Sequence, residues 1–233
     1  MKQIISFAFA LIILSACHRI QGSGNIVTET RPTGDFTGIS AGGAFEVELK
    51  TGPVTEVRIE ADDNLMPYIQ TRVSGNVLNI TTKGNTNFID GHYKAYITAP
   101  DINYLNGSGA ASIRIMNGIK NSEKIKLESS GAASIKGEVD APKITTEASG
   151  AANITVSGRT MDYDAEASGS ATIDTEELMS ETTKARASGA ATVQVYSSLS
   201  LNADASGAAN IHYKGSGTTV VKTSGAANIK KDD

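Results

Sequence analysis

A six-residue motif, Ser-Gly-Ala-Ala-polar-Ile, recurs in the second half of the chain. Seven copies begin at Ser108, Ser130, Ser149, Ser168, Ser188, Ser206 and Ser224, at spacings of 22, 19, 19, 20, 18 and 18 residues. Helical repeats need about 33 residues or more to form two packed helices. A period near 19 residues instead fits one coil of a β-solenoid, in which every repeat position becomes a column along the axis.

Each column of the repeat has a mechanical explanation. The fourth motif position is always alanine, and the sixth is isoleucine except for Val193, so both columns predict a narrow core. The second position is always glycine, which indicates a turn with positive φ or a backbone approach that excludes a Cβ atom. The fifth position is always Ser, Thr or Asn and predicts a polar ladder or turn hydrogen bonds, with a ligand-binding stripe as the alternative.

The residues around each motif alternate between two faces. Ile144, Thr146 and Ala148 share one face before the third copy, while Thr145 and Glu147 point the other way, as in half-buried strands. We therefore expect an all-β chain whose residues 101–233 form a parallel β-helix, or β-solenoid, with about seven Ser-Gly-Ala-Ala coils.

Residues 25–100 lack the motif and carry larger apolar side chains in alternating runs, such as Phe45 to Leu49 and Val57 to Ala61. Ser74-Gly75-Asn76 lies between two of these runs and predicts a hairpin turn. We expect this N-terminal β region to pack on the first coil and cap it, because solenoids need capped ends for solubility.

Residues 1–16 have the features of a signal peptide. The apolar stretch from Ile4 to Leu14 is too short to span a bilayer as a helix, and a small-residue cleavage site follows it. Leu14-Ser15-Ala16-Cys17 resembles a bacterial lipobox, so we expect Cys17 to be lipidated and residues 17–24 to form a linker. Cys17 is the only cysteine, which excludes an intramolecular disulfide. His18 stands where many inner-membrane lipoproteins have Asp, which favours the outer membrane and leaves the leaflet open.

The runs FTGISAGGAFEVELKTG and VRIEADDNLMPYIQTRVSGNVLNI, together with the recurrent SGAANI, resemble the bacterial family called "putative auto-transporter adhesin, head GIN domain". The similarity extends over residues 34–230. It implies a right-handed parallel β-helix, common in lipoproteins of Bacteroidetes-type bacteria. The family supplies no catalytic residues to carry over.

The composition excludes several other functions. The net charge is −4, and Lys and Arg are scattered, so nucleic acid is not an expected partner. His18, His92 and His212 fit no metal-binding spacing, and no Gly-x-Ser-x-Gly elbow is present. We therefore expect no metal, no cofactor and no catalytic residue.

One variable column remains as a candidate site. The residues two before the motif serines include Glu128, Glu147 and Glu166, which would stack on adjacent coils about 5 Å apart. Such a column could hold a hard cation such as Ca²⁺, or supply the paired carboxylates of a glycosidase. A solvated face is the simpler explanation, since Arg186, Asp204 and Lys222 continue the column with alternating charge and the flanking Lys126, Thr145 and Asp164 give a sugar no aromatic platform.

Three functions follow from these features. The first is a non-enzymatic cell-envelope lipoprotein, an adhesin-like binding or structural module held by the lipid on Cys17, with a glycan or a protein as its ligand. The second is a carbohydrate-active β-helix enzyme that uses the Glu128, Glu147 and Glu166 column. The third is an assembly role through the last coil. We favour the first, and the sequence leaves the oligomeric state open.

Overall fold

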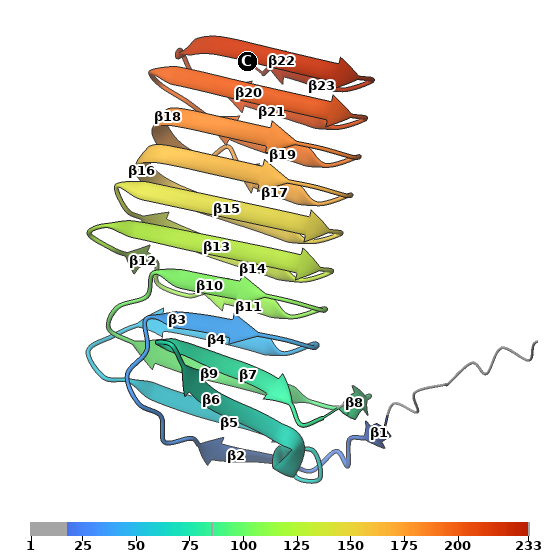
Figure 1. Ribbon diagram of the computed structural model, residues 1–233. Helices are drawn as coiled ribbons and strands as arrows, with labels where there is room; N and C mark the ends of the chain where they lie inside the picture. The colour runs from blue at the N-terminus through green and yellow to red at the C-terminus, as the bar shows by residue number, and fades with distance from the viewer. Residues whose placement is uncertain (1–17, 85, 233) are drawn as a thin grey trace, which may run out of the picture.

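The computed structural model describes residues 18–84 and 86–232, which form 23 strands and one 3₁₀ turn (Figure 1). The elements are β1 (His18–Gln21), β2 (Ile26–Thr30), β3 (Gly38–Ala41), β4 (Glu46–Thr51), β5 (Glu56–Asp62), η1 (Met66–Tyr68), β6 (Ile69–Ser74), β7 (Val77–Thr82), β8 (Thr86–Ile89), β9 (Tyr93–Ala99), β10 (Tyr104–Gly107), β11 (Ser112–Ile115), β12 (Ile119–Lys120), β13 (Lys124–Gly131), β14 (Ser134–Asp140), β15 (Lys143–Gly150), β16 (Asn153–Ala167), β17 (Thr172–Thr175), β18 (Leu178–Ala187), β19 (Thr192–Tyr196), β20 (Ser200–Gly207), β21 (Asn210–Lys214), β22 (Thr218–Gly225) and β23 (Asn228–Lys231).

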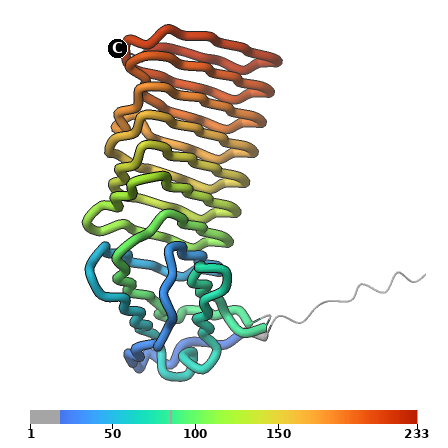
Figure 2. The backbone as a smooth tube through the Cα atoms, turned by 60° about the vertical axis from the view of Figure 1, so that its left-hand side comes forward, coloured from blue at the N-terminus to red at the C-terminus, as the bar shows by residue number. Residues whose placement is uncertain are grey.

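The predicted all-β solenoid is confirmed. The front sheet contains β3, β10, β13, β15, the last part of β16, β18, β20 and β22. The rear sheet contains β4, β11, β14, the first part of β16, β17, β19, β21 and β23. Each coil contributes one strand to each sheet, and these strands pair in parallel with their counterparts in the next coil. Figure 1 shows the front strands running to the right and the rear strands returning while the chain rises, so the coil is right-handed. Figure 2 shows the coils as evenly stacked rungs. A short third side joins the sheets where β12, β14, β16 and β18 pair.

The core lies between the two sheets and is as narrow as the sequence predicts. The motif alanines from Ala111 to Ala209 and the motif Ile or Val residues from Ile113 to Ile211 are all at most 1% exposed. Their equivalents in the last described coil, Ala227 and Ile229, are only partly buried because no further described coil covers them. Alanine fits where the two sheets converge beside the turn, and isoleucine fits where they separate.

The glycine column has both of the causes that the sequence suggests. All seven motif glycines have φ between 71° and 77°, the left-handed region that favours glycine. The carbonyls of the first six also accept a hydrogen bond from the next coil, for example from the backbone N–H of Ala190 to the Gly169 oxygen at 2.7 Å. A Cβ atom on Gly169 would lie 2.9 Å from the carbonyl oxygen of Gly150. The column is therefore set by conformation and by close backbone contact.

The polar ladder expected at the fifth motif position is only partly formed. Ser134 donates its hydroxyl to the Ser112 hydroxyl at 3.2 Å, which links two coils. Asn153 instead donates its amide to the carbonyl of Ala151 within its own coil, at 3.4 Å. Hydrogen bonds to the backbone of the turn therefore account for part of this column.

One coil precedes the first copy of the motif. Strands β3 and β4 pair in parallel with β10 and β11, and Gly42-Gly43-Ala44-Phe45 makes the turn between them. Gly43 has φ 76°, and its carbonyl accepts the N–H of Ala110 at 2.6 Å, as in the motif turns. Fully buried Phe45 stands where the later coils have alanine, so this end of the core is wider.

The N-terminal end of the stack changes from parallel to antiparallel pairing. Strands β7 and β9 pair in parallel with β3 and β4, and then β6 and β5 pair with β7 and β9 in antiparallel fashion. The predicted hairpin joins β6 and β7, with Gly75 and Asn76 at φ 58° and 64°. Tyr93 packs edge-on against Phe45 and Phe88, with ring centroids 5.1 and 5.0 Å apart. This region covers the lower end of the core and supplies the capping region that the sequence predicts.

Candidate functional site

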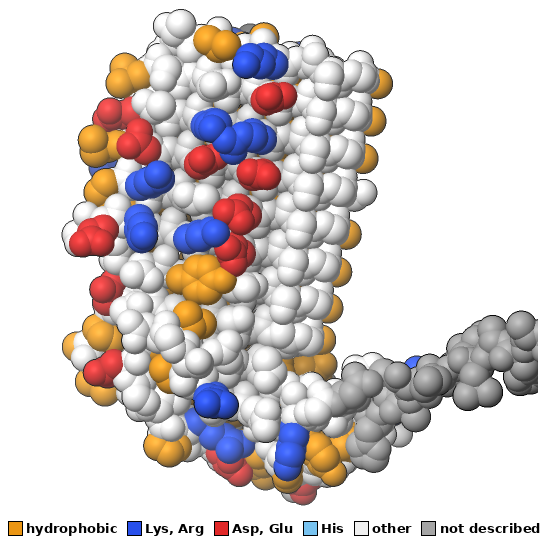
Figure 3. All heavy atoms as spheres, viewed as in Figure 1, with side chains coloured by type: hydrophobic (Ala, Val, Ile, Leu, Met, Phe, Trp, Pro, Cys, Tyr) orange, Lys and Arg blue, Asp and Glu red, His pale blue; other side chains and the backbone are white. Residues whose placement is uncertain are grey.

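The outward side chains of the front sheet form columns that run the length of the stack. The register aligns one residue from each strand in a central column: Arg72, Asn79, Ser40, Asn106, Glu128, Glu147, Glu166, Arg186, Asp204 and Lys222. A flanking column contains Tyr104, Lys126, Thr145, Asp164 and Lys184. Figure 3 shows red and blue side chains interleaved along the upper part of this face, beside a largely uncharged strip.

The structure brings the three predicted glutamates together, but each one already contacts a cation. The Lys126 ammonium lies 2.5 Å from Glu128 Oε1 and 3.0 Å from Glu147 Oε1. Arg186 lies 3.4 Å from Glu166 Oε2 and also contacts Asp164. Among residues 18–84 and 86–232, no group of three or more His, Cys, Asp and Glu side chains is arranged to hold a metal ion. A groove of about 360 Å³ lies over the three glutamates and the serines beside them.

The environment of Glu128 favours its ionised form. Burial acts to raise the pKa of this carboxyl, but hydrogen bonds from Lys126 and from the Tyr104 hydroxyl outweigh it, so the pKa lies below its usual value. The hydrogen bond to Glu128, followed by that to Glu147, raises the pKa of Lys126. A glycosidase acid needs a raised pKa. Glu128 has the opposite shift.

These pKa shifts give a prediction for Lys126→Gln. Without the ammonium, the pKa of Glu128 should rise, which can be measured by carboxyl-carbon NMR titration. Because the folded-state pKa is lowered, the stability that this carboxylate adds is present above its unfolded-state pKa and is lost as pH falls through the folded value. The variant should lose part of that acid dependence. Lys184→Gln, which removes a cation from the same flanking column, should leave the Glu128 titration unchanged; an equal shift in both variants would contradict the assignment.

An aromatic side chain stands one coil below the predicted glutamates. Tyr104 precedes Lys126 in the flanking column, donates its hydroxyl to Glu128 Oε2 at 2.5 Å and accepts the Asn106 amide at 3.1 Å. Gly38 separates it from Val77, and a Cβ atom on Gly38 would lie 3.1 Å from both side chains. The sequence reading missed Tyr104 because it considered only the flanking residues beside the three glutamates. Extending that column by one coil would have found it.

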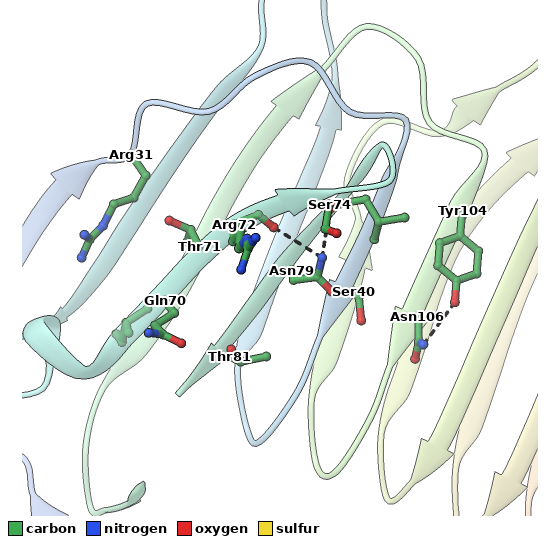
Figure 4. A pocket seen from close by; sticks show the side chains of 12 residues that line it. Arg31, Ser40, Gln70, Thr71, Arg72, Ser74, Asn79, Thr81, Tyr104 and Asn106 are labelled. Atoms are coloured by element: carbon green, nitrogen blue, oxygen red, sulfur yellow. Dashed lines mark hydrogen bonds between the residues drawn. The ribbon is translucent and has the colours of Figure 1, made fainter. Parts of the chain in front are cut away.

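A broad hollow of the described surface lies below Tyr104, where the front sheet ends in β6 (Figure 4). This open trough has a volume of about 980 Å³. It is lined by Arg31, Ser40, Ile69, Gln70, Thr71, Arg72, Ser74, Val77, Asn79, Thr81, Tyr104 and Asn106. The middle of its floor carries the short side chain of Ser40, between the longer Tyr104 and Arg72.

The trough has two cationic side chains and no acidic one. Arg31 contacts Glu29, outside the lining, at 2.9 Å and donates to the Met66 carbonyl at 3.3 Å, while its buried Nε has no hydrogen-bond partner. In the described part of the chain, Arg72 makes no ion pair within 4.0 Å. The Asn79 amide donates to the carbonyls of Arg72 and Val77, which holds the side chain in place on the trough floor.

The other sequence candidates lie apart from this face or outside the described residues. His92 contacts Glu60 at 2.8 Å, and His212 contacts Asp232 at 2.9 Å on the rear sheet. Cys17 and the signal peptide lie outside the described residues. Within residues 18–84 and 86–232, no helix is long and apolar enough to cross a bilayer.

The family and the fold have known counterparts. The family model "Putative auto-transporter adhesin, head GIN domain" matches residues 35–217. A crystal structure described as a putative adhesin from Bacteroides fragilis is 22% identical, with a TM-score of 0.86 over 91% of this chain and all of the other. One described as a putative adhesin from Parabacteroides merdae is 18% identical, with a TM-score of 0.77 over 93% of this chain and all of the other.

A third solved structure is described as a putative lipid binding protein from Parabacteroides distasonis. It is 20% identical, with a TM-score of 0.78 over 92% of this chain and all of the other. No curated protein matches the chain. At these identities the three structures establish a shared fold, and the family model covers most of the chain.

Proposed function

The chain belongs to the bacterial family of "putative auto-transporter adhesins" with a head GIN domain, and on this premise we propose that it is a non-enzymatic binding module of the cell envelope. Its ligand, a glycan or a protein, binds on the front sheet. The family suggests a surface or envelope protein. The proposed binding role rests on the geometry of the front sheet, and the proposed lipid anchor rests on the sequence around Cys17.

The trough on the front sheet carries this proposal. It is a broad, open hollow, and it combines amide, hydroxyl and guanidinium groups with one tyrosine ring. Binding sites place a few polar groups around a concave surface to fix orientation. Strands β7, β3 and β10 are each paired on both sides, and the edge strand β6 pairs with β7. The floor of the trough is therefore preformed, and ligand binding requires little ordering.

The alternative of a carbohydrate-active enzyme would use Glu128, Glu147 and Glu166. Lys126 and Arg186 contact all three carboxylates, and the lowered pKa of Glu128 opposes a role as general acid. These contacts support a structural role for the column, in which the cations relieve repulsion between stacked glutamates.

The proposed anchor is the lipid on Cys17. The next residue, His18, begins β1, which pairs with β8 at the capped end of the stack. A lipid there would attach the solenoid to the membrane by its N-terminal end. We propose the outer membrane, because His18 replaces the Asp of inner-membrane retention signals.

A binding test separates the candidate functions. The chain from residue 18, which contains every described strand, is immobilised and exposed to polysaccharides and glycoproteins while bound material and newly formed reducing ends are both measured. We expect retention of a ligand without new reducing ends. Release of reducing ends that Glu147→Gln abolishes would establish the enzyme instead. If no ligand is retained and no reducing ends are released, the result would contradict the binding role and favour assembly.

A further inference from the structure

We infer that the trough is a binding site for a carboxylated saccharide, an inference that rests on the proposed binding function and names its ligand class. The guanidinium of Arg72 binds the carboxylate, and Tyr104 contacts the sugar ring.

The charge of the trough selects an anion. Arg31 and Arg72 are in its lining and no Asp or Glu is, although the whole chain has a net charge of −4. Arg31 contacts Glu29 outside the lining, so Arg72 carries the uncompensated charge. Elsewhere on the same sheet the cations Lys126 and Arg186 contact acidic neighbours. Arg72 is exposed and lacks such a partner in the described part of the chain. A guanidinium presents its donors in a planar fork that matches a carboxylate.

The remaining polar groups fit the hydroxyls of a saccharide. The Asn79 and Asn106 amide nitrogens already donate within the protein, to the carbonyls of Arg72 and Val77 and to the Tyr104 hydroxyl. Their side-chain oxygens remain as acceptors. Gln70 and Ser40 add amide and hydroxyl groups on the same face. Groups that can both donate and accept are what sugar hydroxyls require, whereas an inorganic anion would use donors alone.

Tyr104 supplies the apolar contact. Its hydroxyl is fixed by Glu128 and Asn106, so the ring is held in one orientation. Figure 4 shows the Tyr104 ring lying along its strand at one side of the trough, with Arg72 on β6 across the floor from it. Aromatic rings combine a broad apolar face with little loss of conformational entropy on binding. A neutral sugar residue on Tyr104 can therefore be linked to an acidic residue at Arg72, which lies three strands away.

The trough is larger than one sugar ring, and its two ends differ in charge. Its volume of about 980 Å³ lies at the upper end of the range for small-molecule sites, which indicates an oligosaccharide. Beyond Asn106 the surface continues into the groove over Glu128 and Glu147. That groove disfavours a second carboxylate, so the acidic residue of the ligand lies at the Arg72 end and neutral residues extend toward Glu128.

The test is a glycan array followed by titration calorimetry with the chain from residue 18. The array carries oligosaccharides containing uronic or sialic acid, their methyl-ester forms, sulfated and phosphorylated saccharides, and neutral ones. We expect binding to carboxylated members and about tenfold weaker binding to their esters, since esterification removes one charge-assisted hydrogen bond. Binding only to neutral, sulfated or phosphorylated members would overturn this inference and leave the binding function intact. Binding to none would overturn this inference and would leave a protein as the only ligand class for the proposed binding function.

Matched variants locate the site on the best carboxylated ligand. Arg72→Gln should weaken binding about tenfold, whereas Lys184→Gln makes the same charge change on the same sheet away from the trough and should have no effect. Tyr104→Ala should abolish binding, and Tyr104→Phe should retain it because the ring is kept. Unfolding midpoints of all four variants exclude misfolding as the cause. Equal affinities for Arg72→Gln and the unchanged chain would overturn the inference.

Discussion

Gly169→Ala is expected to destabilise the chain by about 2–5 kcal/mol, the largest effect of any single methyl group that we predict. Gly169 has φ 76°, where a Cβ atom costs about 1–2 kcal/mol. That atom would also lie 2.9 Å from the Gly150 carbonyl oxygen and 3.2 Å from its nitrogen. Backbone cannot move aside as a flexible side chain can, so the contact adds an overpacking cost of about 1–3 kcal/mol.

Gly43 provides a matched control for that prediction. It makes the equivalent turn one coil before the motif begins and has the same φ of 76°, but a Cβ atom there would meet nothing within 4 Å. Gly43→Ala should therefore show only the conformational cost, about 1–2 kcal/mol. Urea denaturation of both variants gives the difference. Equal losses of stability would mean that conformation alone explains the glycine column.

Cys17→Ser is expected to move the chain from the membrane fraction to the soluble fraction completely. Lipid attached at Cys17 would be the only covalent anchor, since the chain has no other cysteine, and stable attachment requires more than one acyl chain. Metabolic labelling with a radioactive fatty acid should disappear with it. Ser15→Ala, a conservative change within the same lipobox, should keep both the label and the membrane fraction. Persistent labelling of Cys17→Ser would contradict lipidation at this residue.

The repeat made most of the solenoid predictable because stacking turns one-dimensional periodicity into columns. Once Ser108 and Ser130 are recognised as equivalent, the period assigns Ala111 and Ile113 to the core and Glu128, Glu147 and Glu166 to a shared outward column. The register of β13, β15 and β16 places those glutamates side by side. Parallel pairing demands this, because a one-residue slip would reverse every buried and exposed position.

The coil formed by β3 and β4 was not predicted, because its turn is Gly42-Gly43-Ala44-Phe45 and shares only the glycine and one alanine with the motif. A motif search depends on identity, whereas the fold requires only positive φ at Gly43 and an apolar side chain at Phe45. Once this coil is added, the central column extends to Ser40 and Asn79. The trough is built around these positions.

The trough itself could not be read from the sequence. Arg31 and Arg72 are far from Tyr104 along the chain, and antiparallel β6 brings Arg72 onto the same face through a hairpin. The pairing of Lys126 with both Glu128 and Glu147 was also not predictable, because side chains choose partners among several neighbours in adjacent columns. Stacking positions side chains, but their ion pairs depend on the rotamers that packing allows.

We propose that the chain binds its ligand on the front sheet at the N-terminal end of the stack. Backbone amide NMR spectra of the chain from residue 18, recorded with and without the best ligand from the array, test it most directly. We predict that the shifted amides map to β6, β7, β3 and β10, around Arg72 and Tyr104. Shifts confined to β22 and β23, or to the rear sheet, would contradict the account.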